Sequence, residues 1–192
     1  LDLIIDNYRF GQVPRIVDND GDMVRLLQGL RGSQGEWDWE TAFSYAKATK
    51  DDVTRNRVSN TLATEALSDS SMDAFNPLDP TYEGSNIERI LIDVYRKSET
   101  ELTTFDFKVS NNELFELGAG SVAGLIGFEW RKEEYRDDRD PRLDGTIVFT
   151  DYQGDTYPYV SDVANSSPTG DSSGYRNVTS MFAELQISML DT

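Results

Sequence analysis

The chain has 192 residues and a formal charge of −17, from 35 acidic and 18 basic residues. This acid excess argues against a nucleic-acid partner and against adsorption on an anionic membrane surface. The sequence contains no cysteine and no histidine, which excludes disulfides, thiolate or zinc sites, and Ser-His or Cys-His catalysis within the chain. We therefore expect a protein that is not an enzyme and that carries no metal and no cofactor.

A membrane-spanning helix is not expected, because no stretch approaches the ~18–20 apolar residues that such a helix needs. A transmembrane β-barrel escapes this test, since its strands alternate polar and apolar residues. The first residues, LDLIIDNYRF, lack Met and the pattern of a signal peptide, and the last, AELQISMLDT, stop within an alternating run. We therefore expect the chain to be a piece of a longer protein.

The N-terminal part of the chain predicts a strand followed by a turn. Residues 3–17 are the predicted strand, although Pro14 cannot donate a hydrogen bond to a neighbouring strand. Residues 18–22 (DNDGD) begin like an EF-hand calcium loop, but the glycine and glutamate that such a loop needs at its sixth and twelfth positions are replaced by Met23 and Gly29. We therefore predict a tight Asn-Asp-Gly hairpin at this place.

A strict period of two, typical of a strand whose faces have different surroundings, runs through residues 37–50. One face carries Trp37, Trp39, Thr41, Phe43 and Tyr45, and the other carries Asp38, Glu40, Ala42, Ser44 and Ala46. Similar alternation predicts strands at residues 23–33, 100–114, 121–137 and 178–190, with Phe182 as an exception on the polar face of the last. We expect about six to eight antiparallel up-and-down strands in all.

Short and long connections alternate along the chain. Tight turns at SQGE (33–36) and FELGAG (115–120) join strands in pairs, whereas long links run from Lys50 to Glu99 and from Asp138 to Tyr175. Up-and-down strands then place the short turns at one end and the long loops at the other, as in transmembrane β-barrels. In the long loops we predict a short helix within residues 51–70, a helix of one or two turns that starts with Ser85 as its cap within residues 85–96, and a loop tip at residues 166–174.

The aromatic residues suggest which surroundings the apolar face has. Trp and Tyr are favoured at the two membrane–water boundaries. We expect Trp37 and Trp39 in one aromatic girdle, Tyr45 and Trp130 in the other, and the charged face toward a polar lumen. The alternative is a soluble β-sandwich in which one face of the sheet is exposed to solvent. It explains the alternation, but neither the length of the strands nor the placement of the long loops at one end.

Candidate sites are few. Residues 133–145 (EEYRDDRDPRLDG) are either a Ca²⁺ or polar-ligand site at the base of a loop or, as we favour, a salt-bridged and solvated strand end, because arginines compete with any cation. Paired carboxylates such as Glu133 and Glu134 arise by chance in so acidic a chain, so we predict no catalytic residue. The residues expected to contact a ligand lie in the long loops: Tyr82, Arg139, Arg142, Tyr152, Tyr157 and Tyr159.

Four segments resemble the barrel of TonB-dependent outer-membrane receptors. They are RLLQGLRGSQGEWDWETAFSYAKA (25–48), FNPLDP (75–80), LIGFEWRKEEYRDDRDPRLDG (125–145) and SPTGDSSGYRNVTSMFAELQI (167–187). Their order and spacing carry the resemblance, which extends from about residue 8 to the end. It implies a barrel of about 22 strands with an N-terminal plug, ligand binding at the outer face, and uptake driven through TonB.

The resemblance implies that residues 1–192 are part of the receptor's β-barrel domain, without its TonB box, plug domain and C-terminal aromatic strand. The expected function is nutrient uptake across the outer membrane of a Gram-negative bacterium, with a siderophore, cobalamin or saccharide as the ligand. The expected partners are TonB, this small molecule and outer-membrane lipid. The alternative is a secreted soluble β-protein that binds glycan or Ca²⁺ through its acidic loops.

Overall fold

The computed structural model describes residues 8–78, 85–118 and 120–187. It divides the chain into two compact units. The first, called here the loop unit, comprises residues 1–20, 50–97 and 137–172, and the second, the sheet unit, comprises residues 21–49, 98–136 and 173–192. Each is described by itself below.

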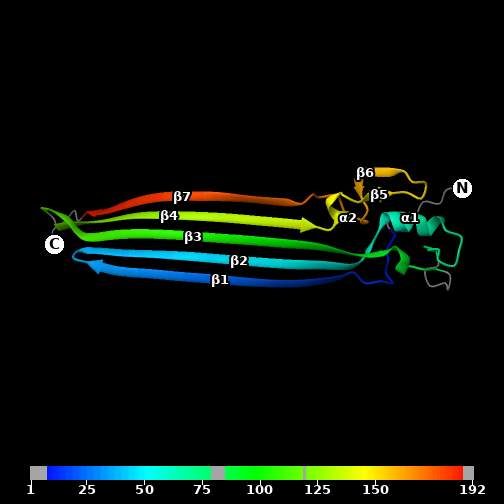
Figure 1. Cartoon of the computed structure of the whole chain (residues 1–192), viewed down its shortest axis with the longest axis horizontal. Coiled ribbons are helices and arrows are strands. Elements are labelled where there is room, and N and C mark those ends of the chain that lie inside the picture. Colours follow the sequence, from blue (N-terminus) through cyan, green and yellow to red (C-terminus); the bar gives the residue numbers. More distant parts are fainter. Residues whose placement is uncertain (1–7, 79–84, 119, 188–192) are drawn as a thin grey trace. The chain divides into compact units, whose positions relative to one another are not determined.

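Strands make up 66% of the described residues, and most of them belong to one antiparallel sheet of five. Its hydrogen-bonded order is β1 (Ile16–Gln34), β2 (Trp37–Val58), β3 (Leu91–Leu117), β4 (Gly120–Arg139) and β7 (Ser172–Ile187) (Figure 1). Two shorter strands, β5 (Val148–Thr150) and β6 (Thr156–Ser161), form a separate antiparallel hairpin. The all-β, antiparallel prediction is therefore confirmed. Within the described residues the five-stranded sheet ends at β1 and β7 and does not close on itself.

The turns and connections have the predicted asymmetry. Only Gly35 and Glu36 separate β1 from β2, and Gly35 has a φ of 62°, which a glycine adopts without steric cost. A similarly short turn follows Leu117. The first connection, residues 59–90, contains α1 (Asn60–Ser68) and the 3₁₀ helix η1 (Glu88–Ile90). The second connection, residues 140–171, contains α2 (Pro141–Asp144) and the β5–β6 hairpin.

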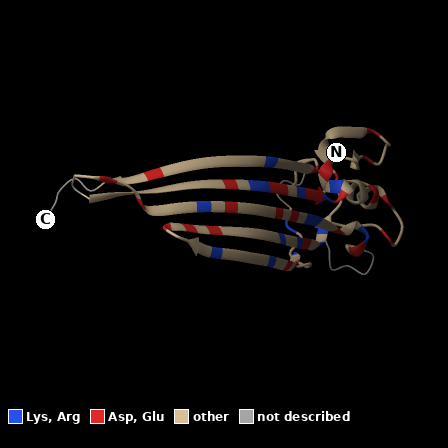
Figure 2. Ribbon diagram, turned by 60° about the vertical axis from the view of Figure 1, so that its left-hand side comes forward, with Lys and Arg blue, Asp and Glu red and all other residues tan. Residues whose placement is uncertain are grey.

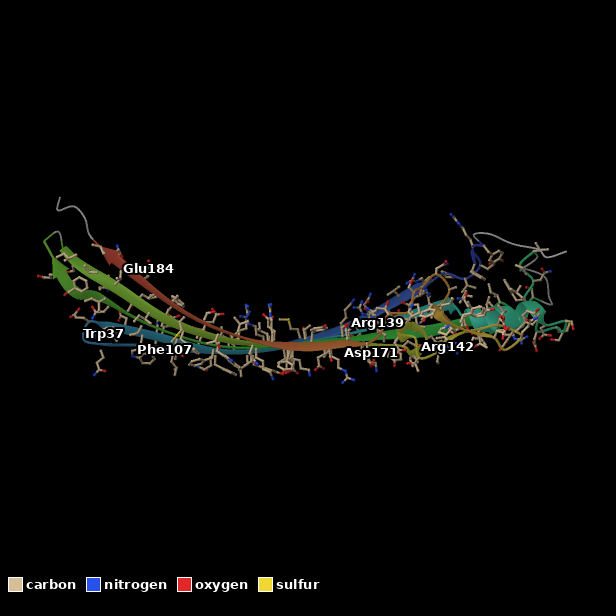
Figure 3. All side chains as sticks on the ribbon, turned by 90° about the horizontal axis from the view of Figure 1, so that it is seen from above. Trp37, Phe107, Arg139, Arg142, Asp171 and Glu184 are labelled. Atoms are coloured by element: carbon tan, nitrogen blue, oxygen red, sulfur yellow. The ribbon has the colours of Figure 1, made fainter. Side chains whose placement is uncertain are left out.

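Alternation along the strands produces two distinct faces in the sheet unit. The rings of Phe105 and Phe128 lie 6.3 Å apart on one face, which we call the ring-bearing face. On the other, the polar face, Lys108 Nζ lies 3.3 Å from Glu40 Oε2. Figure 3 shows Trp37 and Phe107 on one side of the ribbon and Glu184 on the other.

The strands extend further than the alternation predicted. The helix predicted for residues 51–70 begins only at Asn60, because the chain remains in β2 as far as Val58. The helix of one or two turns predicted to start at Ser85 is reduced to the three residues of η1, which begins at Glu88, and β3 starts at Leu91. These extensions carry polar residues on both faces, so they lack the period of two on which the predicted ends depended.

The N-terminal predictions are also corrected. Residues 1–7 lie outside the described residues, and residues 8–15 form no strand, so the strand predicted for 3–17 begins only at Ile16. The hairpin predicted at DNDGD is wrong, because β1 continues straight through it. Pairing with β2 outweighs the local turn preference, and Arg55 Nε of that strand bonds Asp18 Oδ2 at 2.6 Å.

Strand β7 explains one exception in the pattern. Its start at Ser172 shortens the loop tip predicted for residues 166–174, and the predicted residues 188–190 lie outside the described part of the chain. Phe182 lies over Gly127 of β4, where a Cβ atom would fall 2.1 Å from the ring. The ring packs over the backbone of Gly127, which has no side chain to cover it. Aromatic residues commonly cover strand glycines in this way.

Only the loop unit has an apolar core among the described residues. Val58, Ala66, Phe75 and Ile90 are buried together there. Ser59 caps α1 and positions Ala66 in this core, since its Oγ accepts a hydrogen bond from Leu62 N at 3.1 Å. Neither α1 nor α2, the α-helices of the described residues, is long and apolar enough to cross a membrane.

Candidate functional site

The ring-bearing face of the sheet unit carries an uncharged band on three neighbouring strands. It runs from Trp37 to Tyr45 on β2, from Thr103 to Val109 on β3 and from Val122 to Trp130 on β4, counting every second residue. Many of its large side chains are exposed, including Phe43 at 41% and Ile126 at 61%. Figure 2 shows the charged residues of the strands separated by long uncharged stretches.

The band ends at a row of ion pairs. The next residues on the same face are Lys47 on β2, Glu101 on β3 and Lys132 on β4. Lys47 Nζ lies 2.9 Å from Glu101 Oε1 and 2.8 Å from Glu99 Oε1, and Lys132 Nζ lies 2.7 Å from Glu134 Oε1. The change from rings to charges therefore occurs at the same level on all three strands.

The four predicted interface aromatics all lie on this face. Trp37 and Trp39 stand beside the β1–β2 turn, with exposed fractions of 47% and 36%. Trp39 covers Gly32 of β1, where a Cβ atom would lie 2.7 Å from the indole. Tyr45 and Trp130 stand at the opposite edge of the band, directly before the ion pairs. Contact of these residues with lipid stays a prediction.

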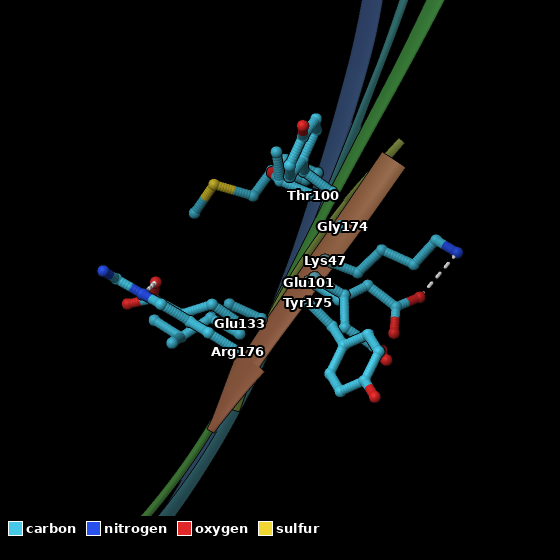
Figure 4. A pocket seen from close by; sticks show the side chains of 13 residues that line it. Lys47, Thr100, Glu101, Glu133, Gly174, Tyr175 and Arg176 are labelled. Carbon is cyan, nitrogen blue, oxygen red and sulfur yellow. Dashed lines mark hydrogen bonds and ion pairs between the residues drawn. The ribbon is translucent and has the colours of Figure 1, made fainter. Parts of the chain in front are cut away.

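A depression of about 630 Å³ lies within the sheet unit. Figure 4 shows Glu133 and Arg176 on one side of the ribbon and Lys47, Glu101 and Tyr175 on the other. Small or uncharged residues form much of its lining: Ala46, Ala48, Thr100, Leu102 and Gly174. Arg176 pairs with Glu133, so the charges on that side neutralise each other and the depression presents mainly uncharged surface.

The loop unit is organised around a buried carboxylate, Asp162. Ser59 Oγ donates to its Oδ2 at 2.8 Å and Thr61 N donates to its Oδ1 at 2.9 Å. Arg142 Nη1 also donates to it, while Asp162 itself is fully buried. Burial alone would raise the pKa of Asp162, but the hydrogen bonds from these three residues outweigh it and hold that pKa below its ordinary value.

The two predicted ligand-binding arginines both have acidic partners. Arg142 binds Asp162, as described above. Arg139 Nη2 lies 3.1 Å from Asp137 Oδ2, and Asp137 also receives Arg96 Nε at 2.6 Å. These pairs agree with the salt-bridged interpretation of residues 133–145. Ligand contact by either arginine stays a prediction, and would have to compete with these pairs.

The structure gathers three predicted tyrosines in the β5–β6 hairpin. Tyr157 stacks on Phe149 with ring centroids 5.1 Å apart, and its hydroxyl donates to Asp151 Oδ2 at 3.0 Å. Tyr152 is exposed, and Tyr159 is 93% exposed. Tyr82 lies outside the described residues. Of the three tyrosines in this hairpin, Tyr159 therefore has the most accessible ring.

Sequence reasoning did not identify Asp162 or its partner Ser59. A single aspartate in a polar loop has no spacing that distinguishes it from its neighbours. Ser59 carries a usable signal, because a serine directly before a helix-forming segment is a common cap.

Comparison with models of protein families, with curated proteins and with solved structures finds no match to this chain. Function is therefore inferred from the surfaces described above.

Proposed function

We propose that this chain forms part of the wall and the external loops of a transmembrane β-barrel, in an outer-membrane receptor that takes up a scarce nutrient. One observation carries the proposal. On the ring-bearing face, three adjacent strands carry uncharged bands that end together at Lys47, Glu101 and Lys132. A lipid layer imposes such a common boundary on neighbouring strands, whereas water does not.

The height of the band agrees with a membrane. From Trp37 to Lys47, the first charged residue beyond the band, a strand rises ~33 Å at ~3.3 Å per residue, which a tilt of ~40° reduces to about 25 Å along the membrane normal. The uncharged band itself, from Trp37 to Tyr45, spans about 20 Å by the same calculation, so it fits within the apolar layer of about 25 Å in outer-membrane barrels. Val122 and Lys132 on β4 are separated by the same number of residues as Trp37 and Lys47. The remaining length of these strands would lie outside the hydrocarbon.

The chemistry at the two edges of the band supports the same assignment. Trp37 and Trp39 lie at the edge beside the short turn, and Tyr45 and Trp130 lie at the edge beside the ion pairs. Their rings suit a boundary where one side of the ring is apolar and the polar atom stays hydrated. The polar face, with its Lys108–Glu40 pair, would then line the interior of the barrel.

The alternative of a soluble β-sandwich requires a second layer over one face of the sheet. In the described residues, Phe43 and Ile126 of the ring-bearing face remain exposed. The cluster of buried apolar side chains in the described part of the chain lies in the loop unit and contains none of the rings of the band. A soluble protein would expose an unusually large apolar patch in this arrangement.

The sequence resemblance extends the proposal to the class of receptor and to the energy source for uptake. The four segments quoted above resemble TonB-dependent receptors, so uptake would be coupled to TonB through a region outside these residues. The ligand would be a siderophore complex, cobalamin or a saccharide, met first by the long connections. Tyr159 and Tyr152 are the more exposed of the three hairpin tyrosines and are the residues we assign to this contact.

Cell fractionation tests the proposal directly. The intact gene product is expressed in a Gram-negative host, and the outer membrane is separated from the soluble fractions. We expect the protein in the detergent-extracted outer membrane, with slower electrophoretic migration after boiling, as a folded barrel loses its compactness. Recovery as a freely soluble periplasmic or secreted monomer would refute the proposal and favour the soluble alternative.

A further inference from the structure

The two long connections are joined by hydrogen bonds at their bases. Asn60 N donates to Asp162 O at 2.6 Å, and Ala164 N donates to Val58 O at 2.9 Å, around an isolated antiparallel bridge between Ser59 and Val163. The segment that leads into α1 is thus paired with the segment that follows β6.

Side chains reinforce this junction from both directions. Asp162 of the second connection accepts hydrogen bonds from Ser59 and Thr61 of the first. In return, Thr61 Oγ1 accepts one from Thr150 N of β5, at 3.0 Å. Arg142, near the start of the second connection, pairs with the same carboxylate.

The junction is also shielded from water. Ser59, Ser161, Asp162 and Val163 each have an exposed fraction of 0 or 1%. A carboxylate that stays buried after losing its partners raises the free energy of the protein. We therefore expect the hydrogen bonds and the ion pair at Asp162 to break together. We infer that Asp162 is a latch that makes the two connections open and close as one body. This inference does not depend on the proposed function.

The latch has a consequence for any ligand of the loop unit. A contact made only by the β5–β6 hairpin would be transmitted to α1, because Thr61 and Asp162 join these elements. Motion of one connection alone would leave the carboxylate of Asp162 without its partners while it stays buried. Local opening free energies should therefore be equal in the two connections.

Hydrogen exchange of the intact gene product tests the latch. We expect Asp162→Asn to accelerate amide exchange on the order of 100-fold, and by the same factor, in residues 60–68 and in residues 148–161. The amide of asparagine keeps one acceptor for Ser59 or Thr61, but it presents a donor to Arg142. Asp155→Asn, in the exposed turn of the same hairpin, is the matched control and should change neither segment.

A second variant keeps the inference falsifiable if Asp162→Asn fails to accumulate. Arg142→Gln alters only the second connection, yet it should also accelerate exchange in α1 of the first. Amides of β2 between residues 38 and 45 serve as the internal reference and should stay unchanged. Acceleration confined to one connection in either variant, or no acceleration in both, would overturn the latch.

Discussion

A charge placed at the centre of the uncharged band is the sharpest test of its contact with lipid. Ile126 lies midway between Val122 and Trp130 on the ring-bearing face of β4 and is 61% exposed. Ile126→Lys therefore removes little packing but places an ammonium group at the level of the bilayer centre. Ala123→Lys, on the polar face of the same strand, is the matched control.

The two environments predict different costs for Ile126→Lys. In lipid, a lysine at the midplane of an outer-membrane barrel costs about 2–4 kcal/mol, which is roughly a 30- to 900-fold change in the folding equilibrium. In water, a substitution on so exposed a side chain changes the free energy of unfolding by only about 0.5 kcal/mol. We expect the first value for Ile126→Lys and the second for Ala123→Lys.

Denaturant titration of the intact protein in lipid vesicles measures both costs, with electrophoretic mobility before boiling as the readout for the folded state. Additional lysines on different strands at the same level should give equal costs. If Ile126→Lys and Ala123→Lys shift the midpoint equally, the ring-bearing face does not contact hydrocarbon and the reasoning is refuted.

Three further predictions concern acid, packing and ligand contact. The pKa of Asp162 is held below its ordinary value. The stabilisation that its ionised form gives the loop unit is therefore complete above the unfolded pKa of about 3.9 and is lost as pH falls through the lower folded pKa. Exchange protection of the loop unit should decrease below about pH 4, and equal protection at pH 3 and pH 7 would contradict this. Gly127→Leu should displace the ring of Phe182 and cost about 1–3 kcal/mol in denaturant titration, whereas Gly118→Leu, with no atom near its Cβ position, should cost far less; equal losses would exclude the ring contact. Tyr159→Ala should leave the melting temperature unchanged, because the side chain is 93% exposed, but should weaken uptake or binding of the cognate nutrient severalfold; unchanged affinity in a titration would remove Tyr159 from the ligand surface.

The predictable part of the fold is the part where the two faces of a strand differ. From Trp37 to Tyr45 the alternation of rings with acidic and small residues marked the strand and assigned its faces correctly. Beyond Lys47 both faces become polar, and the period that identifies a strand disappears. That is why residues 51–58 were predicted as helix although hydrogen bonds to neighbouring strands keep them extended.

Long-range partners explain the remaining errors. The DNDGD segment has strong turn residues, but Arg55 and the ladder of β2 hold it straight, and nothing in its local sequence reveals that partner. The β5–β6 hairpin was not predicted, although its turn from Asp151 to Asp155 contains Gly154 at a φ of 90°. The role of Asp162 depends on contacts from Ser59 and Arg142, so it emerges only after the chain has folded.

The tight corner at Gly35 and Glu36 has a consequence for how this protein can vary in length. Side chains alternate strictly between the two faces of a strand. Lengthening that corner by one amino acid without a compensating bulge would therefore shift the register and exchange the apolar and the polar face of an entire strand. A similar insertion in residues 59–90 or 140–171 has no such effect, since added length in a long surface segment costs little closure entropy. Relatives and engineered variants should therefore keep the corner at constant length and gain or lose residues at the opposite end.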